Sequence, residues 1–185
     1  QCNQTCLEES VSLDNIYYSV ALNLFEELAT TYPEAQIWMV GHSLGGSVAA
    51  LLGQVFRAPT VTFEAPGDLL PARRLHLPMP PAVDYKKLPI WHFGHTADPI
   101  FMGVCTGAVS SCYYAGYAME SKCHSGRTCI YDVTAKWGWK SDIRTHRIMD
   151  VIELVIKKWD DVPVCEPEEG CVDCGLWDMV DDSAI

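Results

Sequence analysis

The sequence predicts an α/β fold in which a mostly parallel β-sheet is flanked by helices. Three observations support this class: short apolar runs bounded by Pro or Gly, longer segments with apolar residues at intervals of three and four, and a glycine-rich turn that joins one short run to a small-residue helix. Short apolar runs suit parallel strands that are covered on both faces. With 185 residues, 49% of them hydrophobic, the chain is long enough to form a globular core.

The first element is an amphipathic helix predicted over residues 14–31, and Pro33 lies just past its end. Its apolar residues at helical spacing are Ile16, Tyr17, Val20, Ala21, Leu24, Phe25 and Leu28. A short buried strand follows at residues 36–40. After a glycine-rich turn, a second helix is predicted to continue to Phe56.

Three further strands are predicted at residues 59–63, 88–93 and 128–133. The segments between them are predicted to be largely irregular. Residues 66–89 contain six prolines, too many for a continuous helix, and residues 105–129 are rich in Gly, Ser and Tyr. We expect residues 105–129 to be stapled by a disulfide within that segment, with Cys123 and Cys129 closing a loop.

The last predicted helix covers residues 147–159, where apolar residues again recur at helical spacing. Beyond it the composition turns acidic. We therefore predict a folded domain over residues 1–159 and an acidic, cysteine-containing tail over residues 160–185.

Nine cysteines in a chain of this size, scattered rather than arranged with zinc-site spacing, indicate an oxidising compartment of the secretory pathway. Cys171 and Cys174 have CxxC spacing, but no second pair or histidine cluster lies near them, so a disulfide is favoured over a redox or metal site. The sequon that begins at Asn3 predicts N-glycosylation there. Because nine is odd, at least one sulfur stays free or bonds outside this chain. No metal and no cofactor are expected.

The net charge of −11 is concentrated in the tail, because residues 160–185 hold nine acidic residues and no Lys or Arg. The body before them carries only −2. An acidic chain without a basic stripe argues against nucleic acid as a partner. The longest apolar run, residues 48–52, is far shorter than the roughly 18 residues needed to span a bilayer.

The glycine-rich turn carries the pattern G-x-S-x-G, with Ser43 between Gly41 and Gly45. In this pattern the serine lies on a strained turn between a strand and a helix, and we expect side chains at either glycine to collide with neighbouring backbone. The hydroxyl of Ser43 is thereby exposed as a nucleophile. The backbone N–H of Leu44, at the helix N-terminus, is predicted to donate to the oxyanion of a tetrahedral intermediate. This turn predicts the α/β-hydrolase fold.

A serine nucleophile needs a histidine base and a carboxylate that orients the base, and in this fold they follow in the order Ser, Asp or Glu, His. Asp98 directly follows the predicted strand at residues 88–93, which places it at the sheet edge where active sites collect. The other candidates for the acid are weaker by position: Asp68, Asp84, Asp132 and Asp142.

After Asp98 the order leaves His124 and His146 as candidates for the base. His146, immediately before the last helix, is favoured over His124, which lies between two cysteines. We expect His42 to pack or bond locally, His92 to be a satisfied strand histidine, and His95 to support the turn that carries the acid.

The sequence resembles the fungal-type, class 3 lipases at residues 37–47 (IWMVGHSLGGS). The spacing also fits, since the acid lies 55 residues after the serine and the histidine 48 residues after the acid. Within that family, the chain resembles more narrowly the autophagy-related vacuolar phospholipases of fungi. The motifs that carry this resemblance are residues 62–67 (TFEAPG), 92–103 (HFGHTADPIFMG) and 123–133. The resemblance covers residues 10–160. Residues 1–159 would then form the C-terminal part of a lipase domain.

The resemblance implies an enzyme that reaches the vacuole lumen from a membrane-anchored precursor and hydrolyses phospholipids of autophagic and intravacuolar membranes. It also implies early strands, a lid and a first oxyanion donor before Gln1. We therefore expect a preceding segment, as part of the same chain or as a separate one tied on by the odd cysteine, to complete the sheet. Two alternatives stay open: an esterase acting on soluble esters, and a non-catalytic hydrolase fold used for binding.

Overall fold

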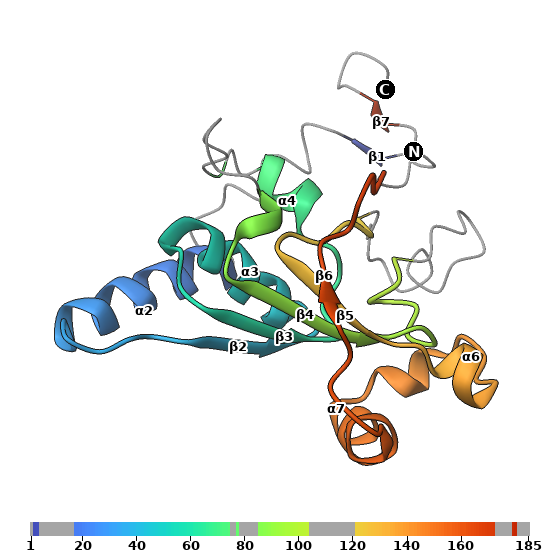
Figure 1. The fold of residues 1–185 in the computed structure, drawn as a ribbon. Coiled ribbons are helices and arrows are strands. Elements are labelled where there is room, and N and C mark those ends of the chain that lie inside the picture. The colour runs from blue at the N-terminus through green and yellow to red at the C-terminus, as the bar shows by residue number, and fades with distance from the viewer. Residues whose placement is uncertain are drawn as a thin grey trace.

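The computed structural model places a five-stranded sheet at the centre of the molecule, with helices on both of its faces (Figure 1). The structure describes residues 2–3, 17–74, 77, 85–103, 121–172 and 179–180. Asp84, one of the candidates for the acid, therefore lies outside the described residues, and so does much of the predicted irregular segment at residues 105–129.

The strands are β1 (Cys2–Asn3), β2 (Met39–His42), β3 (Thr60–Phe63), β4 (Ile90–His95), β5 (Arg127–Tyr131), β6 (Cys165–Glu166) and β7 (Met179–Val180). The helices and helical turns are α2 (Tyr17–Thr31), α3 (Leu44–Phe56), α4 (Leu69–Arg74), η1 (Tyr85–Lys87), α6 (Val133–Trp137), η3 (Ile143–His146), α7 (Ile148–Asp150), η4 (Val151–Val155) and η5 (Ile156–Lys158).

The sheet has the strand order β2-β3-β4-β5-β6. The first four strands are parallel, and only β6 is antiparallel to its neighbour. Because these strands alternate along the chain with helices, their connections run over the faces of the sheet and cover it on both sides. The predicted α/β class is thus confirmed, with the mostly parallel, helix-flanked sheet of an α/β hydrolase. β1 and β7 form a separate parallel pair.

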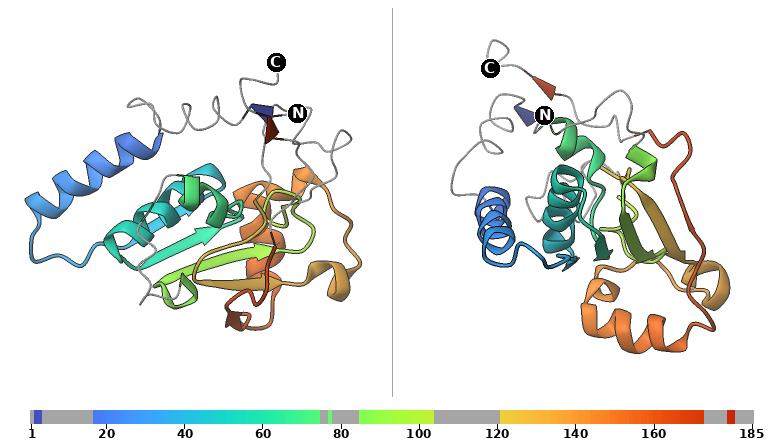
Figure 2. Two further views of the ribbon diagram at one scale, coloured as in Figure 1. Left: turned by 90° about the horizontal axis from the view of Figure 1, so that it is seen from above. Right: turned by 60° about the vertical axis from the view of Figure 1, so that its left-hand side comes forward.

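Helices α2 and α3 lie on one face of the sheet, and the helices at residues 148–158 lie on the other (Figure 2). On the α3 side, Ala50 packs with Leu88 and Ile90. On the opposite side, Tyr131 and Val155 belong to a second buried cluster that also includes Ala97 and Val133. These two buried clusters pack against opposite faces of the sheet and so hold the strands in place.

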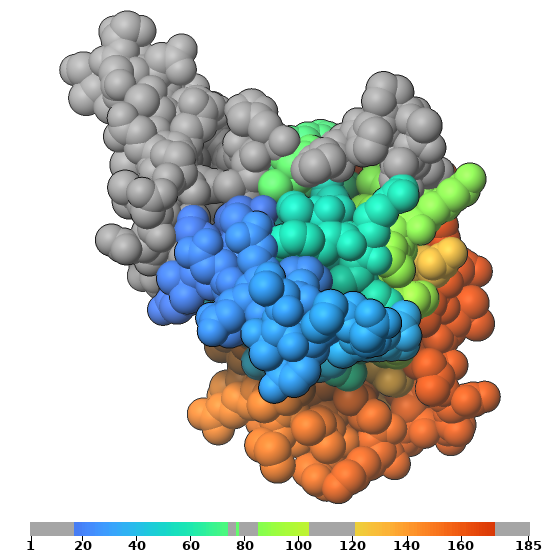
Figure 3. All heavy atoms as spheres, turned by 90° about the vertical axis from the view of Figure 1, so that its left-hand side faces the viewer, coloured from blue at the N-terminus to red at the C-terminus, as the bar shows by residue number. Residues whose placement is uncertain are grey.

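Helix α2 differs from its prediction, because its apolar residues are not buried together. Phe25 stacks on Phe56 of α3 with ring centroids 4.0 Å apart, whereas Val20 and Leu24 are 59% and 55% exposed. On the neighbouring edge strand β2, Val40 is 68% exposed. Figure 3 shows the face of the molecule on which α2 and β2 lie. The periodicity predicted the helix correctly but not how much of its apolar face is covered.

The last predicted helix is present, but its backbone changes from α7 through the wider π-helical turn η4 to the tighter 3₁₀ turn η5. Beyond Trp159 the chain returns to the sheet, where β6 pairs with the edge of β5. Residues 165–171 of the acidic tail are therefore attached to the body. The division at residue 159 stays a prediction.

Two disulfides fasten this part of the tail. Cys123 bonds to Cys171 and Cys129 bonds to Cys165. The expectation that Cys123 and Cys129 close a loop within residues 105–129 is therefore wrong, because β6 runs alongside β5 and brings tail cysteines to them. Within the described part of the chain, every helix is too short or too polar to cross a membrane.

Candidate active site

Ser43 occupies the tight turn between β2 and α3. Its backbone has φ 55° and ψ −130°, a conformation that non-glycine residues rarely adopt. The neighbouring structure holds it there: its N–H donates to Phe63 O on β3, and its carbonyl accepts from Gly46 N and Ser47 N at the start of α3. The turn therefore has the strained strand-to-helix geometry predicted from the motif.

The glycines of the turn have different roles. A Cβ at Gly41 would lie 2.3 Å from the carbonyl oxygen of Gly45, so only glycine fits at position 41. At Gly45 a Cβ meets no atom within 4 Å among the described residues, and the predicted collision there is wrong. The second close approach is instead at Gly46, where a Cβ would lie 2.8 Å from the Cβ of Ala65.

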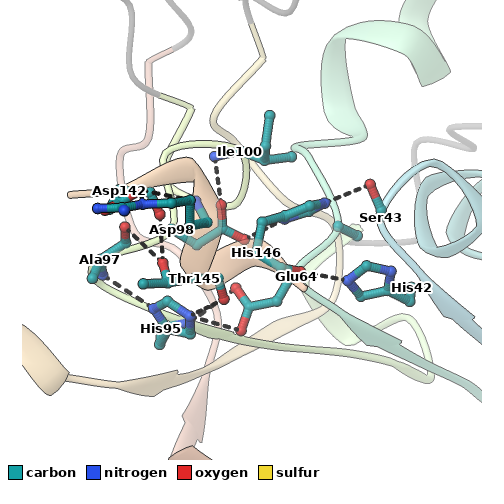
Figure 4. Close-up of polar contacts among 12 residues, drawn as sticks. His42, Ser43, Glu64, His95, Ala97, Asp98, Ile100, Asp142, Thr145 and His146 are labelled. Atoms are coloured by element: carbon teal, nitrogen blue, oxygen red, sulfur yellow. Dashed lines mark hydrogen bonds and ion pairs between the residues drawn. The ribbon is translucent and has the colours of Figure 1, made fainter. Parts of the chain in front are cut away.

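Three side chains that are remote along the chain form one hydrogen-bonded row (Figure 4). The hydroxyl of Ser43 donates to Nε2 of His146 over 2.7 Å, and Nδ1 of His146 donates to a carboxylate oxygen of Asp98 over 2.7 Å. The side chain of Asp98 is fully buried and that of His146 is 17% exposed. The structure therefore brings together the three residues predicted from the sequence, with the carboxylate deepest.

The carboxylate of Asp98 is held by the turn that follows β4. Its Oδ1 accepts from the N–H of Ile100 over 2.8 Å. Burial by itself raises the pKa of Asp98, but hydrogen bonds from His146 and Glu64 outweigh it and hold the pKa below its usual value. Asp98 is therefore the charged member of the row.

Two other histidines hold the backbone carbonyl groups of His146 and of the residue before it. His42 Nε2 bonds to the carbonyl oxygen of His146 over 2.9 Å, and His95 Nε2 bonds to that of Thr145 over 3.1 Å. The expectation that His42 bonds locally is therefore wrong, since its partner lies 104 residues away. His95 also accepts from Ala97 N, so it supports the turn before Asp98 as expected.

The remaining candidates have other partners. Asp132 and Asp142 cap the helical turns that follow them by accepting from Ala135 N and Arg144 N. Asp68 is fully buried and accepts hydrogen bonds from the N–H and hydroxyl of Ser125. In the described structure these acids therefore serve as caps and buried anchors rather than as partners of His146.

His124 also bonds elsewhere. Its Nε2 lies 3.1 Å from the carbonyl of Ala65 and its Nδ1 lies 3.0 Å from the carboxylate of Glu168. Burial lowers the pKa of His124, but Glu168 more than compensates and raises it above its usual value. His92 is fully buried and bonds through Nδ1 to Thr62, and burial lowers its pKa to about 4. Its Nε2 accepts or donates no hydrogen bond within the described residues, so it is less satisfied than expected.

Leu44 is the first residue of α3, so its N–H has no carbonyl one turn earlier with which to bond. An amide at this position is available to an anion beside Ser43. A possible metal group of Cys123, Glu168 and Cys171 lies elsewhere, but its two sulfurs are joined in a disulfide and offer no thiolate. The turn thus combines the Ser43 hydroxyl with the backbone amide at the start of α3.

The sheet, its flanking helices and the serine turn together define an α/β hydrolase. Comparisons with known proteins agree: residues 8–63, which include this turn, match the family described as Lipase (class 3). No solved structure matches the chain significantly.

The chain is also similar to several fungal proteins named "Putative lipase ATG15". It is 48% identical over 179 residues to that of Vanderwaltozyma polyspora, covering 97% of this chain and 32% of the relative. The proteins of Kluyveromyces lactis and Saccharomyces cerevisiae S288c are 49% and 48% identical, again over 97% of this chain, and 34% of each is covered. The predicted resemblance to class 3 lipases, and among them to these fungal proteins, is confirmed. The chain spans about a third of the length of these relatives.

Proposed function

We propose that this chain carries the nucleophile, base and acid of a serine hydrolase that cleaves acyl esters of lipids and phospholipids. The observation that carries the proposal is the row of hydrogen bonds from Ser43 through His146 to Asp98, each 2.7 Å long. The similarity to proteins named as lipases supports lipid esters as the substrate class.

In the first half of the reaction, Ser43 Oγ attacks the ester carbonyl and its proton moves to Nε2 of His146. The resulting imidazolium keeps its Nδ1–H on the carboxylate of Asp98, which stabilises the positive charge without taking the proton. When the tetrahedral intermediate collapses, the bond to the alcohol breaks. The alcohol leaves with the proton from Nε2, and the acyl group remains on Ser43.

In the second half, water attacks the acyl carbonyl and gives its proton to Nε2 of His146. Collapse of the second intermediate releases the fatty acid and returns the proton to Oγ of Ser43, so the site is regenerated. In both halves the negative oxygen accepts a hydrogen bond from the N–H of Leu44, at the N-terminus of α3. Gly41 permits the turn that presents this amide.

Labelling with a fluorophosphonate probe tests the assignment of the nucleophile. The full-length protein should be labelled, Ser43→Ala should not be, and His146→Ala should be labelled at least about 1000-fold more slowly because the hydroxyl loses its base. Ser47→Ala is a matched control from the same helix, since the Ser47 hydroxyl donates to Pro66 O rather than to a histidine. Labelling that persists in Ser43→Ala would refute the proposal.

Two substrates separate the lipase from the soluble-ester alternative. A lipase should release the contents of phospholipid vesicles and hydrolyse their lipids, and Ser43→Ala should do neither. An enzyme that cleaves a soluble ester but leaves vesicles intact would support the esterase alternative. A protein with neither activity would support the non-catalytic alternative.

We also propose that the enzyme works in the vacuole lumen on the membranes of autophagic bodies and intravacuolar vesicles. This rests on the resemblance of its motifs to the autophagy-related lipases, together with disulfides that suit an oxidising compartment. Glycosylation at Asn3 belongs to the same proposal. Fungal cells in which only the Ser43→Ala protein replaces the native relative should accumulate undegraded intravacuolar vesicles.

We further propose that another segment of the same protein covers the β2 edge of the sheet. Trp38 and Val40, at this edge, are 57% and 68% exposed, and the relatives are about three times as long as this chain. A disulfide link to that segment is one form of the proposal. Mass analysis of the mature protein with and without reductant tests it: a second polypeptide that is released only by reduction and has a sequence from outside this chain would support the link.

A further inference from the structure

A second carboxyl group is buried beside Asp98. Glu64 directly follows β3, is fully buried, and has φ 48°, the left-handed conformation that side chains other than Gly and Asn seldom adopt. Its backbone is held there by a hydrogen bond from Glu64 N to Phe93 O over 2.8 Å. In Figure 4 its side chain lies beside the row of Ser43, His146 and Asp98. A glutamate in this position requires a compensating partner.

The side chain of Glu64 has few partners. Its Oε2 accepts from the backbone N–H of His95 over 3.2 Å, and its buried Oε1 accepts no hydrogen bond within the described residues. Three titratable groups face it: the carboxylate of Asp98, the imidazole of His95, and the phenol of Tyr131 on β5. An ionised Glu64 would need a cation among these groups.

His95 is not that cation. Its Nε2 bonds to a backbone carbonyl, which only accepts, so Nε2 carries a hydrogen. Its Nδ1 bonds to the backbone N–H of Ala97, which only donates, so Nδ1 carries none. The ring is therefore neutral, and burial lowers its pKa. The 3.8 Å approach of His95 Nε2 to Glu64 Oε1 is not an ion pair.

Two carboxyl groups that lie side by side in a buried site (Figure 4) cannot both be ionised without a large cost, so one of them holds a proton. Asp98 already accepts from the imidazole of His146 and the N–H of Ile100, and both stabilise its ionised form. Glu64 has only the one backbone donor. The proton therefore belongs to Glu64, where burial and the neighbouring Asp98 raise the pKa well above its usual value.

We propose that Glu64 is a positioning residue for the hydrolase, protonated in the working enzyme and donating its O–H to the carboxylate of Asp98. This rests on the proposed function of Ser43, His146 and Asp98. The neutral acid holds the carboxylate toward the imidazole without adding charge. When Glu64 loses its proton, two negative charges meet in a buried site and the carboxylate is pushed out of line. Activity should therefore fall as Glu64 ionises.

The first test compares pH profiles of kcat/KM for the full-length wild type, Glu64→Gln and the exposed control Glu153→Gln. The amide of glutamine keeps a donor that never ionises, so Glu64→Gln should remain active as the pH rises and the wild type declines. The ratio of kcat/KM for Glu64→Gln to that of the wild type should increase tenfold for each pH unit above the start of the wild-type decline. Glu153→Gln should follow the wild type. The proposal is overturned if the kcat/KM of Glu64→Gln declines with rising pH in the same way as that of the wild type between about pH 4 and 9.

The second test does not depend on activity. Infrared spectra of the Ser43→Ala protein should contain the carbonyl band of a buried, protonated carboxylic acid that Glu64→Gln in the same background removes. If this band is present but the wild-type protein hydrolyses no ester, the protonated state of Glu64 would be supported and the proposed function refuted. Absence of the band would overturn the role of Glu64, whereas the proposed function would still be decided by the labelling of Ser43.

Discussion

The imidazole of His42 donates a hydrogen bond to the backbone carbonyl of His146, across 2.9 Å and 104 residues of chain. The two rings lie 4.9 Å apart between centroids. Because His42 immediately precedes Ser43, the turn that carries the nucleophile also holds the backbone of the proposed base.

Loss of this contact should slow the reaction without weakening substrate binding. His42→Ala is expected to reduce kcat about tenfold with KM nearly unchanged, because His146 would be less well aligned with Ser43. His42→Gln retains a donor and should recover part of the rate. Steady-state kinetics on a lipid ester decides: a kcat of His42→Ala equal to that of the wild type would show that the contact does not position His146.

The glycines of the turn should respond oppositely to alanine. Gly41→Ala places a Cβ 2.3 Å from the Gly45 carbonyl and should destabilise the protein by about 3 kcal/mol. Gly45→Ala meets no atom within 4 Å among the described residues and lies in α3, so it should stabilise the helix by up to about 1 kcal/mol. Denaturant unfolding of the two variants measures the difference, and equal destabilisation would contradict the steric account.

The pair of buried His124 and partly exposed Glu168 should make the stability depend on pH. Both ring nitrogens of His124 face acceptors, so the protonated form is stabilised and its pKa is raised. A raised histidine pKa contributes stability that is full below the unfolded value of about 6.5 and is lost as the pH rises through the folded value. Glu168→Gln should therefore destabilise by about 2 kcal/mol in mild acid and by less in alkali.

The neighbouring Glu169 supplies the control for that measurement. Its carboxylate pairs with Lys86 at the surface and is 75% exposed, so Glu169→Gln should change the free energy of unfolding by less than about 1 kcal/mol at any pH. A loss of stability in Glu168→Gln that is the same in acid and alkali would mean that His124 is not protonated in the folded protein.

The disulfides between β5 and the tail should contribute to stability. The Cys129–Cys165 bond closes 36 residues, and replacing both cysteines with Ser should lower the free energy of unfolding by about 3–4 kcal/mol. Peptide mapping without reductant should recover Cys129 with Cys165 and Cys123 with Cys171. Recovery of Cys123 joined to Cys129 would contradict the described connectivity.

Local patterns predicted much of the sheet and the serine turn. The short apolar runs correspond to β2, β3, β4 and β5, each displaced by at most a few residues, because buried parallel strands need continuous apolar sequence. Chain order and strand ends were enough to select Asp98 and His146, which the structure places in one row with Ser43. Their catalytic role remains a proposal.

Features set by contacts between distant segments were not predictable. β6 has only two residues and leaves no periodic signal, yet it determines which cysteines meet. Glu64 directly follows the predicted strand at residues 59–63, and only the folded chain brings its carboxyl beside Asp98 (Figure 4). The hydrogen bond from His42 to His146 and the exposure of α2 were not predictable for the same reason, because both depend on packing partners rather than on residue spacing.

The way β6 is fastened has a consequence for proteolytic processing. Residues 160–164 form the crossing from the last helix to β6, and Val162 and Val164 there are 66% and 78% exposed, so this stretch is accessible to a protease. A single cut in it would leave both fragments joined through Cys129–Cys165 and Cys123–Cys171. The nicked protein would migrate as one species until reductant separates it into two.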